Sequence, residues 1–262
     1  MINELCYSTT FFGPDANGLD FSEGLSILRQ ADVKFIEWSR KQKINEERIA
    51  LVKQNSLRVW AVHGTLGHGA VSQDKQDFQQ AIDIEVERIR ACKELAPCPY
   101  VIHYLHRFND PERGKIFRRA LELLLQANSD IGLILTVETV PHKPENERYP
   151  NSLEVADFAR SFQDANMQIT IDINHSNLCE NLEQVCENCK GIIANIHVSD
   201  NHGIREEHLI PGEGIIDLKA TMQALRKNGY QGPCNLEMHL EQPLSVNLIK
   251  EISNKVKNIL AF

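Results

Sequence analysis

The sequence lacks several features that identify whole classes of protein. No apolar run in its 262 residues approaches the roughly 18 residues that a membrane-spanning helix requires. There is no basic tract, and the formal net charge is −8, so we do not expect a surface for nucleic acid. The N-terminal segment MINELCYSTTFF has neither a basic region nor a sustained apolar region, so we expect no signal peptide.

The cysteines form no disulfide framework. There are seven, an odd number, and they are scattered along the chain, which is typical of free thiols in a reducing cytoplasm. Cys186 and Cys189, with Cys179 nearby, invite a zinc or redox interpretation. No second pair with the same spacing completes a tetrahedral set, so packing on one helix explains them better.

Short apolar and β-branched runs alternate with segments of helical periodicity along the whole chain. The expected strands are residues 4–9, 33–38, 57–63, 100–104, 132–139, 168–173, 191–198 and 233–239. The expected helices are residues 21–31, 45–54, 73–95, 111–128, 153–162, 182–189, 218–228 and 246–260.

Eight such units without a linker predict one α/β domain over residues 1–262, a closed (β/α)8 TIM barrel. Barrels of this kind commonly need about 250 residues. The main rival is an open doubly wound sheet. That fold would normally show a glycine-rich dinucleotide turn after its first strand, and the residues there, STTFFG, do not supply one.

Acidic residues and histidines recur at one structural position, the carboxyl end of the expected strands. Seven of the eight strands finish on such a residue: Glu37, His63, His103, Glu138, Asp172, His197 and Glu237. Strand ends of a barrel meet around one mouth, so residues that are distant in sequence are expected to converge there.

Four of these residues form a predicted metal site. Glu138, Asp172, His197 and Glu237 follow buried apolar runs, where an isolated charge would be costly unless it is paired or coordinated. Three carboxylates and one imidazole suit a divalent ion such as Mn²⁺, Mg²⁺, Co²⁺ or Zn²⁺.

Other residues near the expected mouth have less certain roles. His63 and His103 fit a substrate contact, a further metal ligand or a structural histidine equally well. Glu37 is interpreted as a partner that orients a ligand. Asp200 follows the apolar run 191–198 and is a further candidate for the mouth. Another polar group, Glu206 with His208, comes just before the turn PGEG.

Two loops are expected beside the mouth. The loop 141–150, which follows Glu138, is either a lid or a solvated connection. His106 and Arg107 after the fourth strand fit a phosphate contact or a plain surface position.

These motifs resemble the xylose-isomerase-like barrels, a superfamily of sugar and sugar-phosphate isomerases and epimerases that also contains the endonuclease IV group (AP endonuclease family 2). The likeness covers nearly the whole chain. Its carriers are FIEW at Glu37, VET at Glu138, IDINH at Asp172 and His175, IHVSDN at His197, HLIPGEGIID from His208, and NLE at Glu237.

The resemblance implies a cytoplasmic metal-dependent isomerase of a small sugar or polyol. Glu138, Asp172, His197 and Glu237 would hold one divalent ion. Glu138 and Glu237 would also exchange a proton with the sugar through a metal-stabilised enediolate. His175 and Arg205 would bind the substrate, with His63, His103 and His208 as further contacts. A homo-oligomer is left open.

Two other chemistries of the same superfamily stay open. Endonuclease IV-like enzymes hold up to three zinc ions for cleaving abasic DNA, which would add His63, His103, His175, Glu206 and His208 to the ligands. Two departures argue against this: Glu206 replaces an aspartate, and TVPHK replaces an asparagine-rich stretch after Glu138. The second is dehydration of a polyol or keto-acid. We favour the isomerase or epimerase on the range of chemistries in the superfamily.

Overall fold

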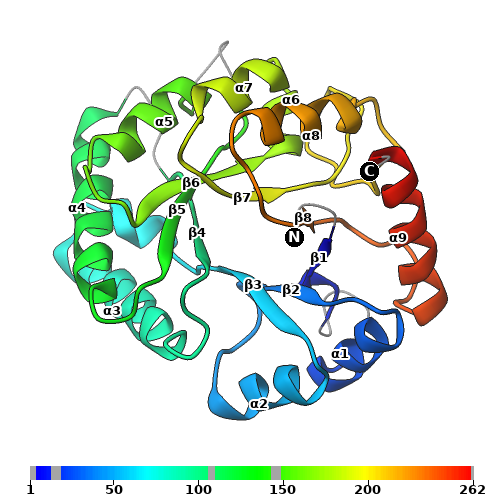
Figure 1. The fold of residues 1–262 in the computed structure, drawn as a ribbon. Helices are drawn as coiled ribbons and strands as arrows, with labels where there is room; N and C mark the ends of the chain where they lie inside the picture. Colours follow the sequence, from blue (N-terminus) through cyan, green and yellow to red (C-terminus); the bar gives the residue numbers. More distant parts are fainter. Residues whose placement is uncertain (1–3, 13–18, 106–109, 143–148, 261–262) are drawn as a thin grey trace.

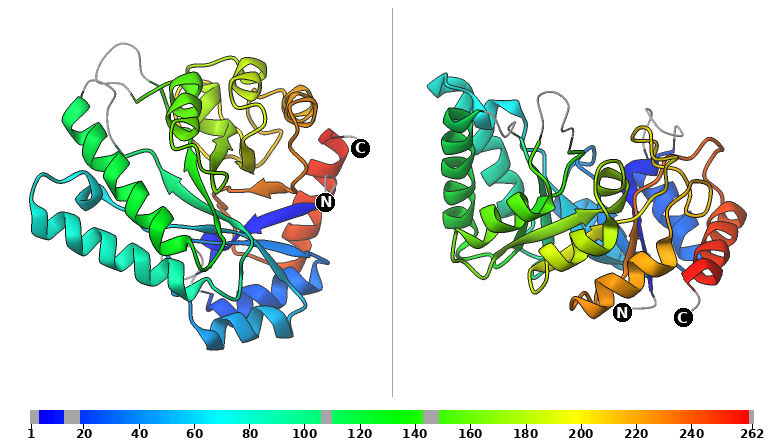
Figure 2. Two further views of the ribbon diagram at one scale, coloured as in Figure 1. Left: turned by 60° about the vertical axis from the view of Figure 1, so that its left-hand side comes forward. Right: turned by 90° about the horizontal axis from the view of Figure 1, so that it is seen from above.

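A computed structural model describes residues 4–12, 19–105, 110–142 and 149–260. Its eight parallel strands lie in one sheet in the order β7-β6-β5-β4-β3-β2-β1-β8, and the helices surround them (Figures 1 and 2). A bridge between Val198, which follows β7, and Leu236 of β8 joins the two ends of the sheet. Val198 N donates to Asn235 O at 2.8 Å, and Glu237 N donates to Val198 O at 3.2 Å. The structure therefore confirms the (β/α)8 TIM barrel.

The strands are β1 (Leu5–Ser8), β2 (Phe35–Trp38), β3 (Arg58–His63), β4 (Pro99–His103), β5 (Ile134–Glu138), β6 (Met167–Asp172), β7 (Ile193–His197) and β8 (Cys234–Leu236). The α-helices are α1 (Phe21–Gln30), α2 (Glu46–Gln54), α3 (Lys75–Ala91), α4 (Pro111–Asn128), α5 (Ser152–Arg160), α6 (Ile173–Asn177), α7 (Leu182–Asn188), α8 (Leu218–Lys227) and α9 (Val246–Leu260). There are two 3₁₀ helices in the described residues: η1 (Thr9–Phe11) follows β1, and η2 (His68–Val71) precedes α3.

Local signals in the sequence explain where the helices begin and end. Asp20 and Asn151 each form a capping box at the start of α1 and α5, which satisfies backbone N–H groups that have no partner inside the helix. Pro111 occupies the first turn of α4, where its missing N–H costs nothing. After α8, Gly229 has a φ of +100°, a left-handed conformation that glycine adopts without strain.

Most predicted elements agree with the structure to within a few residues, with two differences. The helix predicted for 73–95 ends at Ala91, because the chain turns before the Ala96–Pro97 bond. The short helix α6 follows β6 directly and was not predicted, because five polar and apolar residues give no periodicity. No helix in the described ranges is long and apolar enough to cross a membrane.

Candidate functional site

The predicted strand-end residues do gather at one end of the barrel. His63, His103, Glu138, Asp172 and His197 are the last residues of β3, β4, β5, β6 and β7. Glu37 is the penultimate residue of β2, and Glu237 directly follows β8. Because all eight strands are parallel, these positions share one mouth, the end of the barrel where active sites of this fold lie.

Four of the side chains converge on one point. Glu138, Asp172, His197 and Glu237 each offer one ligand atom, and these atoms all lie within 4.8 Å of one another. Nδ1 of His197 is 3.1 Å from Glu138 Oε1, 3.1 Å from Glu237 Oε2 and 3.8 Å from Asp172 Oδ2. The side chains of Glu138, Asp172 and His197 are completely buried, whereas that of Glu237 is 16% exposed. We refer to these four residues as the central group.

The orientation of His197 is fixed from behind by a buried carboxylate. His197 Nε2 lies 2.8 Å from Glu37 Oε2, and Asn235 Nδ2 donates to the same oxygen at 2.8 Å. An Nε2–H that donates to Glu37 leaves the lone pair of Nδ1 directed at the three carboxylates. This is the form in which an imidazole binds a metal.

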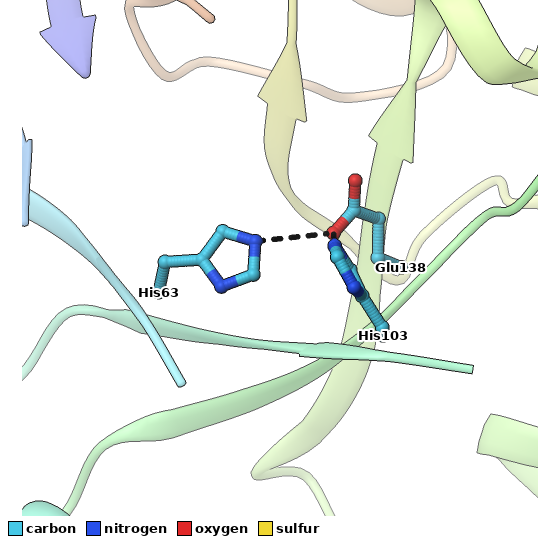
Figure 3. A group of neighbouring side chains, drawn as sticks. All are labelled: His63, His103 and Glu138. Carbon is cyan, nitrogen blue, oxygen red and sulfur yellow. Dashed lines mark ion pairs between the residues drawn. The ribbon is translucent and has the colours of Figure 1, made fainter. Parts of the chain in front are cut away.

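A second group consists of His63, His103 and Glu138, which come from three neighbouring strands (Figure 3). Glu138 Oε2 is 3.1 Å from His103 Nε2 and 3.6 Å from His63 Nε2. Nδ1 of His63 lies 3.0 Å from the carbonyl oxygen of Gly64. Glu138 thus belongs to both groups, with Oε1 in the central group and Oε2 in this one.

A third group consists of His175, Glu206 and His208. Glu206 Oε1 lies 3.4 Å from His175 Nε2 and 2.8 Å from His208 Nε2. Nδ1 of His175 is 3.0 Å from Thr139 O, and Nδ1 of His208 is 3.1 Å from Glu237 O. His208 has a φ of +52°, a left-handed conformation that costs free energy in a residue other than glycine and is found at functional sites.

The second and third groups share an arrangement of histidines that suits divalent cations. His63, His175 and His208 each place Nδ1 against a backbone carbonyl and turn Nε2 toward a carboxylate. Glu138 Oε2 and Asp172 Oδ2 are buried and accept no hydrogen bond. A buried carboxylate oxygen needs a hydrogen-bond donor or a cation as its partner, and a bound metal ion would supply one here. The donor set of carboxylates and imidazoles therefore fits the expected metal.

Charge interactions within the groups shift the acidity of their members. Burial alone lowers the pKa of His175, but Asp172, Glu206 and Glu138 raise it to about 10. Burial likewise opposes protonation of His208, and its hydrogen bond to Glu206 raises the pKa to about 9. The two buried carboxylates differ. Burial raises the pKa of Glu138, yet the neighbouring imidazoles hold it well below its ordinary value, whereas burial raises the pKa of Asp172 above its ordinary value.

The groups open into a pocket of about 750 Å³ at the mouth. Six residues of the three groups line it: His63, His103, His175, Glu206, His208 and Glu237. The loops after β1, β2 and β8 contribute Thr10, Phe11, Ser39, Arg40, Lys41, Met238, His239 and Leu240, and other loops contribute His68, Tyr104, Leu105, Val140, Pro141 and Tyr149. This volume accommodates a small molecule rather than only an ion.

Some predicted residues do not join the site. The guanidinium of Arg205 is 80% exposed, faces Glu207 at 3.6 Å and lines a neighbouring pocket, so a substrate contact for it stays a prediction. Asp200 does not lie in any of the three groups. It accepts from the backbone N–H of Asn201, Gly212 and Ile216 and so holds the loop after β7 in place.

The loops predicted beside the mouth are described only in part. Pro141 and Tyr149 line the pocket, whereas residues 143–148 lie outside the described residues, as do His106 and Arg107. Cys186 and Cys189 are buried, and burial raises the pKa of both thiols to about 12. Neither belongs to the three groups of candidate ligands among the described residues.

Sequence reasoning missed Arg88 of α3. Its guanidinium donates to the carbonyl oxygens of Ser39, Gln42 and His63 at 3.0–3.2 Å, and so joins the loops after β2 and β3. Arg88 is one of several charged residues in α3, so nothing in the sequence distinguishes it from a residue exposed on the surface. Asn235 was recoverable, because it stands two residues before Glu237 and therefore on the same side of β8.

The fold and the site define the class of protein as a (β/α)8 barrel with carboxylates and histidines gathered at the carboxyl ends of its strands. Residues 18–257 match the family described as xylose isomerase-like TIM barrel. The chain belongs to this family.

The individual relatives have low sequence identity to this chain. The chain is 25% identical over 241 residues to an L-ribulose-5-phosphate 3-epimerase, UlaE, of Escherichia coli O1:K1, which covers 86% of this chain and 79% of the relative. Three further curated relatives, among them the 3-dehydro-D-guloside 4-epimerase of Escherichia coli K12 (28% identical), align over only 41–45% of their own length.

Solved structures share the fold. A D-tagatose 3-epimerase-like protein has a TM-score of 0.80 at 18% identity, and each chain is covered to 98%. The IolI protein, solved with a bound zinc atom, has a TM-score of 0.79 at 19% identity, again with 98% of each chain covered.

Proposed function

We propose that this protein is a divalent-metal-dependent isomerase or epimerase of a sugar or sugar phosphate, and that its reaction is proton transfer at the carbon beside a ketose carbonyl. Glu138, Asp172, His197 and Glu237 would hold the ion, which would be Mn²⁺, Mg²⁺, Co²⁺ or Zn²⁺. When bound, the ion would polarise the carbonyl and an adjacent hydroxyl oxygen of the substrate, which acidifies the proton between them.

The chain's own residues would move the proton. Glu237 reaches the pocket and its pKa is held below the ordinary value, mainly by His197, so it is ionised and able to accept a proton. Glu138 would be the second carboxylate: it would take up a proton from water and deliver it to the same carbon from the other side, while Glu237 would release the proton it had accepted. His175 and His208 line the pocket and would bind substrate oxygens.

One observation carries the proposal: Glu138 and Glu237 lie at the same distance, 3.1 Å, from Nδ1 of the same histidine. Two carboxylates beside one candidate cation position are what proton removal and return at a single carbon require. The epimerase names of the relatives and the zinc atom in IolI support the same chemistry.

Solvent deuterium tests this proposal. The Mn²⁺-loaded protein is incubated with pentuloses and pentulose 5-phosphates in D₂O, and the products are followed by NMR. We expect deuterium at one carbon beside the carbonyl and a second epimer or isomer in solution. Treatment with EDTA should stop the exchange. Absence of exchange with every ketose tested would refute the proposal.

A second function is favoured by one specific observation, the sharing of Glu138 between two groups. Together with the third group this gives three sets of ligands, an arrangement that suits three zinc ions and phosphodiester cleavage of abasic DNA. Metal stoichiometry separates the two. One ion per chain after loading and desalting supports the isomerase, whereas three tightly bound zinc ions together with incision of an abasic duplex would favour the nuclease.

A further inference from the structure

The pocket is chemically asymmetric, and its cationic side has no role in the chemistry above. Arg40 and Lys41 line the pocket from the loop after β2. The strands β1 and β2 lie side by side, and their loops contribute Thr10, Phe11, Ser39, Arg40 and Lys41 to the lining. Within the described ranges, the candidate metal ligands that line the pocket come from β3 round to β8 instead: His63, His103, His175, Glu206, His208 and Glu237.

The backbone that carries the two cations is held firmly. The side chains of Ser39 and Gln42 on either side are buried, whereas Arg40 and Lys41 between them are exposed. Ser39 N donates to Thr9 Oγ1 at 2.8 Å, and Gln42 Nε2 donates to Phe12 O at 3.1 Å.

Two further side chains donate hydrogen bonds to the same turn. Arg88 donates to Ser39 O and Gln42 O, and Trp38 Nε1 donates to Gln42 O at 3.3 Å. The segment is thus a preorganised turn that presents two adjacent positive charges to the pocket, and preorganisation lowers the entropic cost of binding a ligand.

Adjacent like charges repel each other, and in the described part of the chain no carboxylate pairs with Arg40 or Lys41. Guanidinium and ammonium groups bind phosphate and carboxylate through charge-assisted hydrogen bonds. An anion placed between them would offset their repulsion at the side of the pocket away from the central group.

We propose that Arg40 and Lys41 form a subsite for the anionic end of the substrate, so that the substrate is a ketose bearing a phosphate or a carboxylate. This inference rests on the proposed function, since the carbonyl end of the same molecule would lie at the central group. The two ends would be bound on opposite sides of one pocket.

Binding to the Mn²⁺-loaded protein tests the subsite without requiring turnover. Isothermal titration calorimetry compares D-ribulose 5-phosphate, D-ribulose and 2-keto-D-gluconate in wild type and in the double variant Arg40→Ala/Lys41→Ala. We expect wild type to bind an anionic ketose at least about tenfold more tightly than D-ribulose. The double variant should lose this preference and bind D-ribulose as before.

Two control variants sharpen the test. Lys43→Ala removes an exposed cation of the same loop that does not line the pocket, and it should keep the preference. The exchange Arg40→Lys/Lys41→Arg keeps both charges and should retain most of it. The preferred anion is identified by the ketose whose affinity falls in the double variant: D-ribulose 5-phosphate for phosphate, or 2-keto-D-gluconate for carboxylate.

The inference and the proposed function can fail separately. Equal binding of D-ribulose and both anionic ketoses by wild type, or a preference that survives in the double variant, would overturn the subsite. A double variant that loses affinity only for abasic duplex DNA would overturn it as well. If the preference depends on the two cations but no ketose is epimerised, the subsite stands and the proposed function fails.

Discussion

His197 and Glu37 form a buried pair, with Nε2 of the histidine 2.8 Å from Oε2 of the glutamate, although the two residues are 160 positions apart in the sequence. Neither side chain is exposed to solvent. The contact orients the imidazole, so that Nδ1 faces the central group.

Loss of this contact should weaken metal binding without unfolding the barrel. In Glu37→Leu no acceptor holds Nε2–H, so the imidazole can adopt the wrong tautomer, and we expect affinity for Mn²⁺ or Zn²⁺ to fall about 10–100-fold. Glu37→Gln keeps an acceptor oxygen and should recover most of the affinity. Competition with a chelating indicator measures both variants, and Glu180→Gln, a carboxylate that binds Ser152 elsewhere, is the matched control. Equal affinities in Glu37→Leu and wild type would remove the orienting role.

Removal of either carboxylate that flanks His197 should abolish turnover. We expect Glu237→Gln and Glu138→Gln to lower kcat by about 10²–10⁴-fold, because general acid–base catalysis contributes that much. The thermal midpoint should change little for Glu237→Gln, whose side chain is partly exposed. Glu94→Gln, an exposed carboxylate paired with Lys53, serves as control. Full activity in both variants would exclude them from the proton transfer.

Metal binding should release protons. In the metal-free protein burial lowers the pKa of His197, but Glu37, Glu237 and Glu138 raise it well above its ordinary value, so this imidazole of the central group is protonated at neutral pH. An ion can bind its Nδ1 only in the neutral form, so affinity should rise with pH between 6 and 9, about tenfold per pH unit for the one proton displaced. Glu138 and Glu237 have lowered pKa values and stay ionised throughout this range.

Calorimetry in buffers with different ionisation enthalpies counts the released protons. His175→Gln should leave the count unchanged, because the ion binds the central group and not the third group. A count that is zero and independent of buffer in wild type would show that His197 loses no proton when the ion binds.

Asp200 should contribute to stability rather than to chemistry. Its buried carboxylate accepts three backbone N–H groups of the loop after β7, so Asp200→Ala leaves three donors without a partner. We expect a loss of about 3 kcal/mol in the free energy of unfolding, since hydrogen bonds to charged groups contribute about 1.5–3 kcal/mol each and water replaces some of them. Urea denaturation measures this. Loss of metal binding with unchanged stability would instead place Asp200 in the site.

Much of the site could be predicted because each buried parallel strand appears in the sequence as a short apolar run that ends in a polar residue. The apolar runs before Glu138, Asp172 and His197 end where the barrel opens, so their convergence follows from the fold. The contact of Glu37 with His197 follows from the same geometry.

Other parts depend on side-chain directions that the sequence does not encode locally. Arg205 turns toward Glu207 because the loop after β7 is shaped by hydrogen bonds to Asp200, which no spacing reveals. The sharing of Glu138 between two groups depends on the separate directions of its two oxygens. The cationic turn at Arg40 is held by Arg88, which lies 46 residues from Gln42, so only the tertiary structure shows it.

The most direct test of the account is anomalous diffraction from crystals of the protein grown with Mn²⁺. The account predicts an anomalous peak about 2.0–2.3 Å from one ligand atom each of Glu138, Asp172, His197 and Glu237. Fully loaded crystals with no peak among these four side chains, and with the ion bound elsewhere, would contradict it.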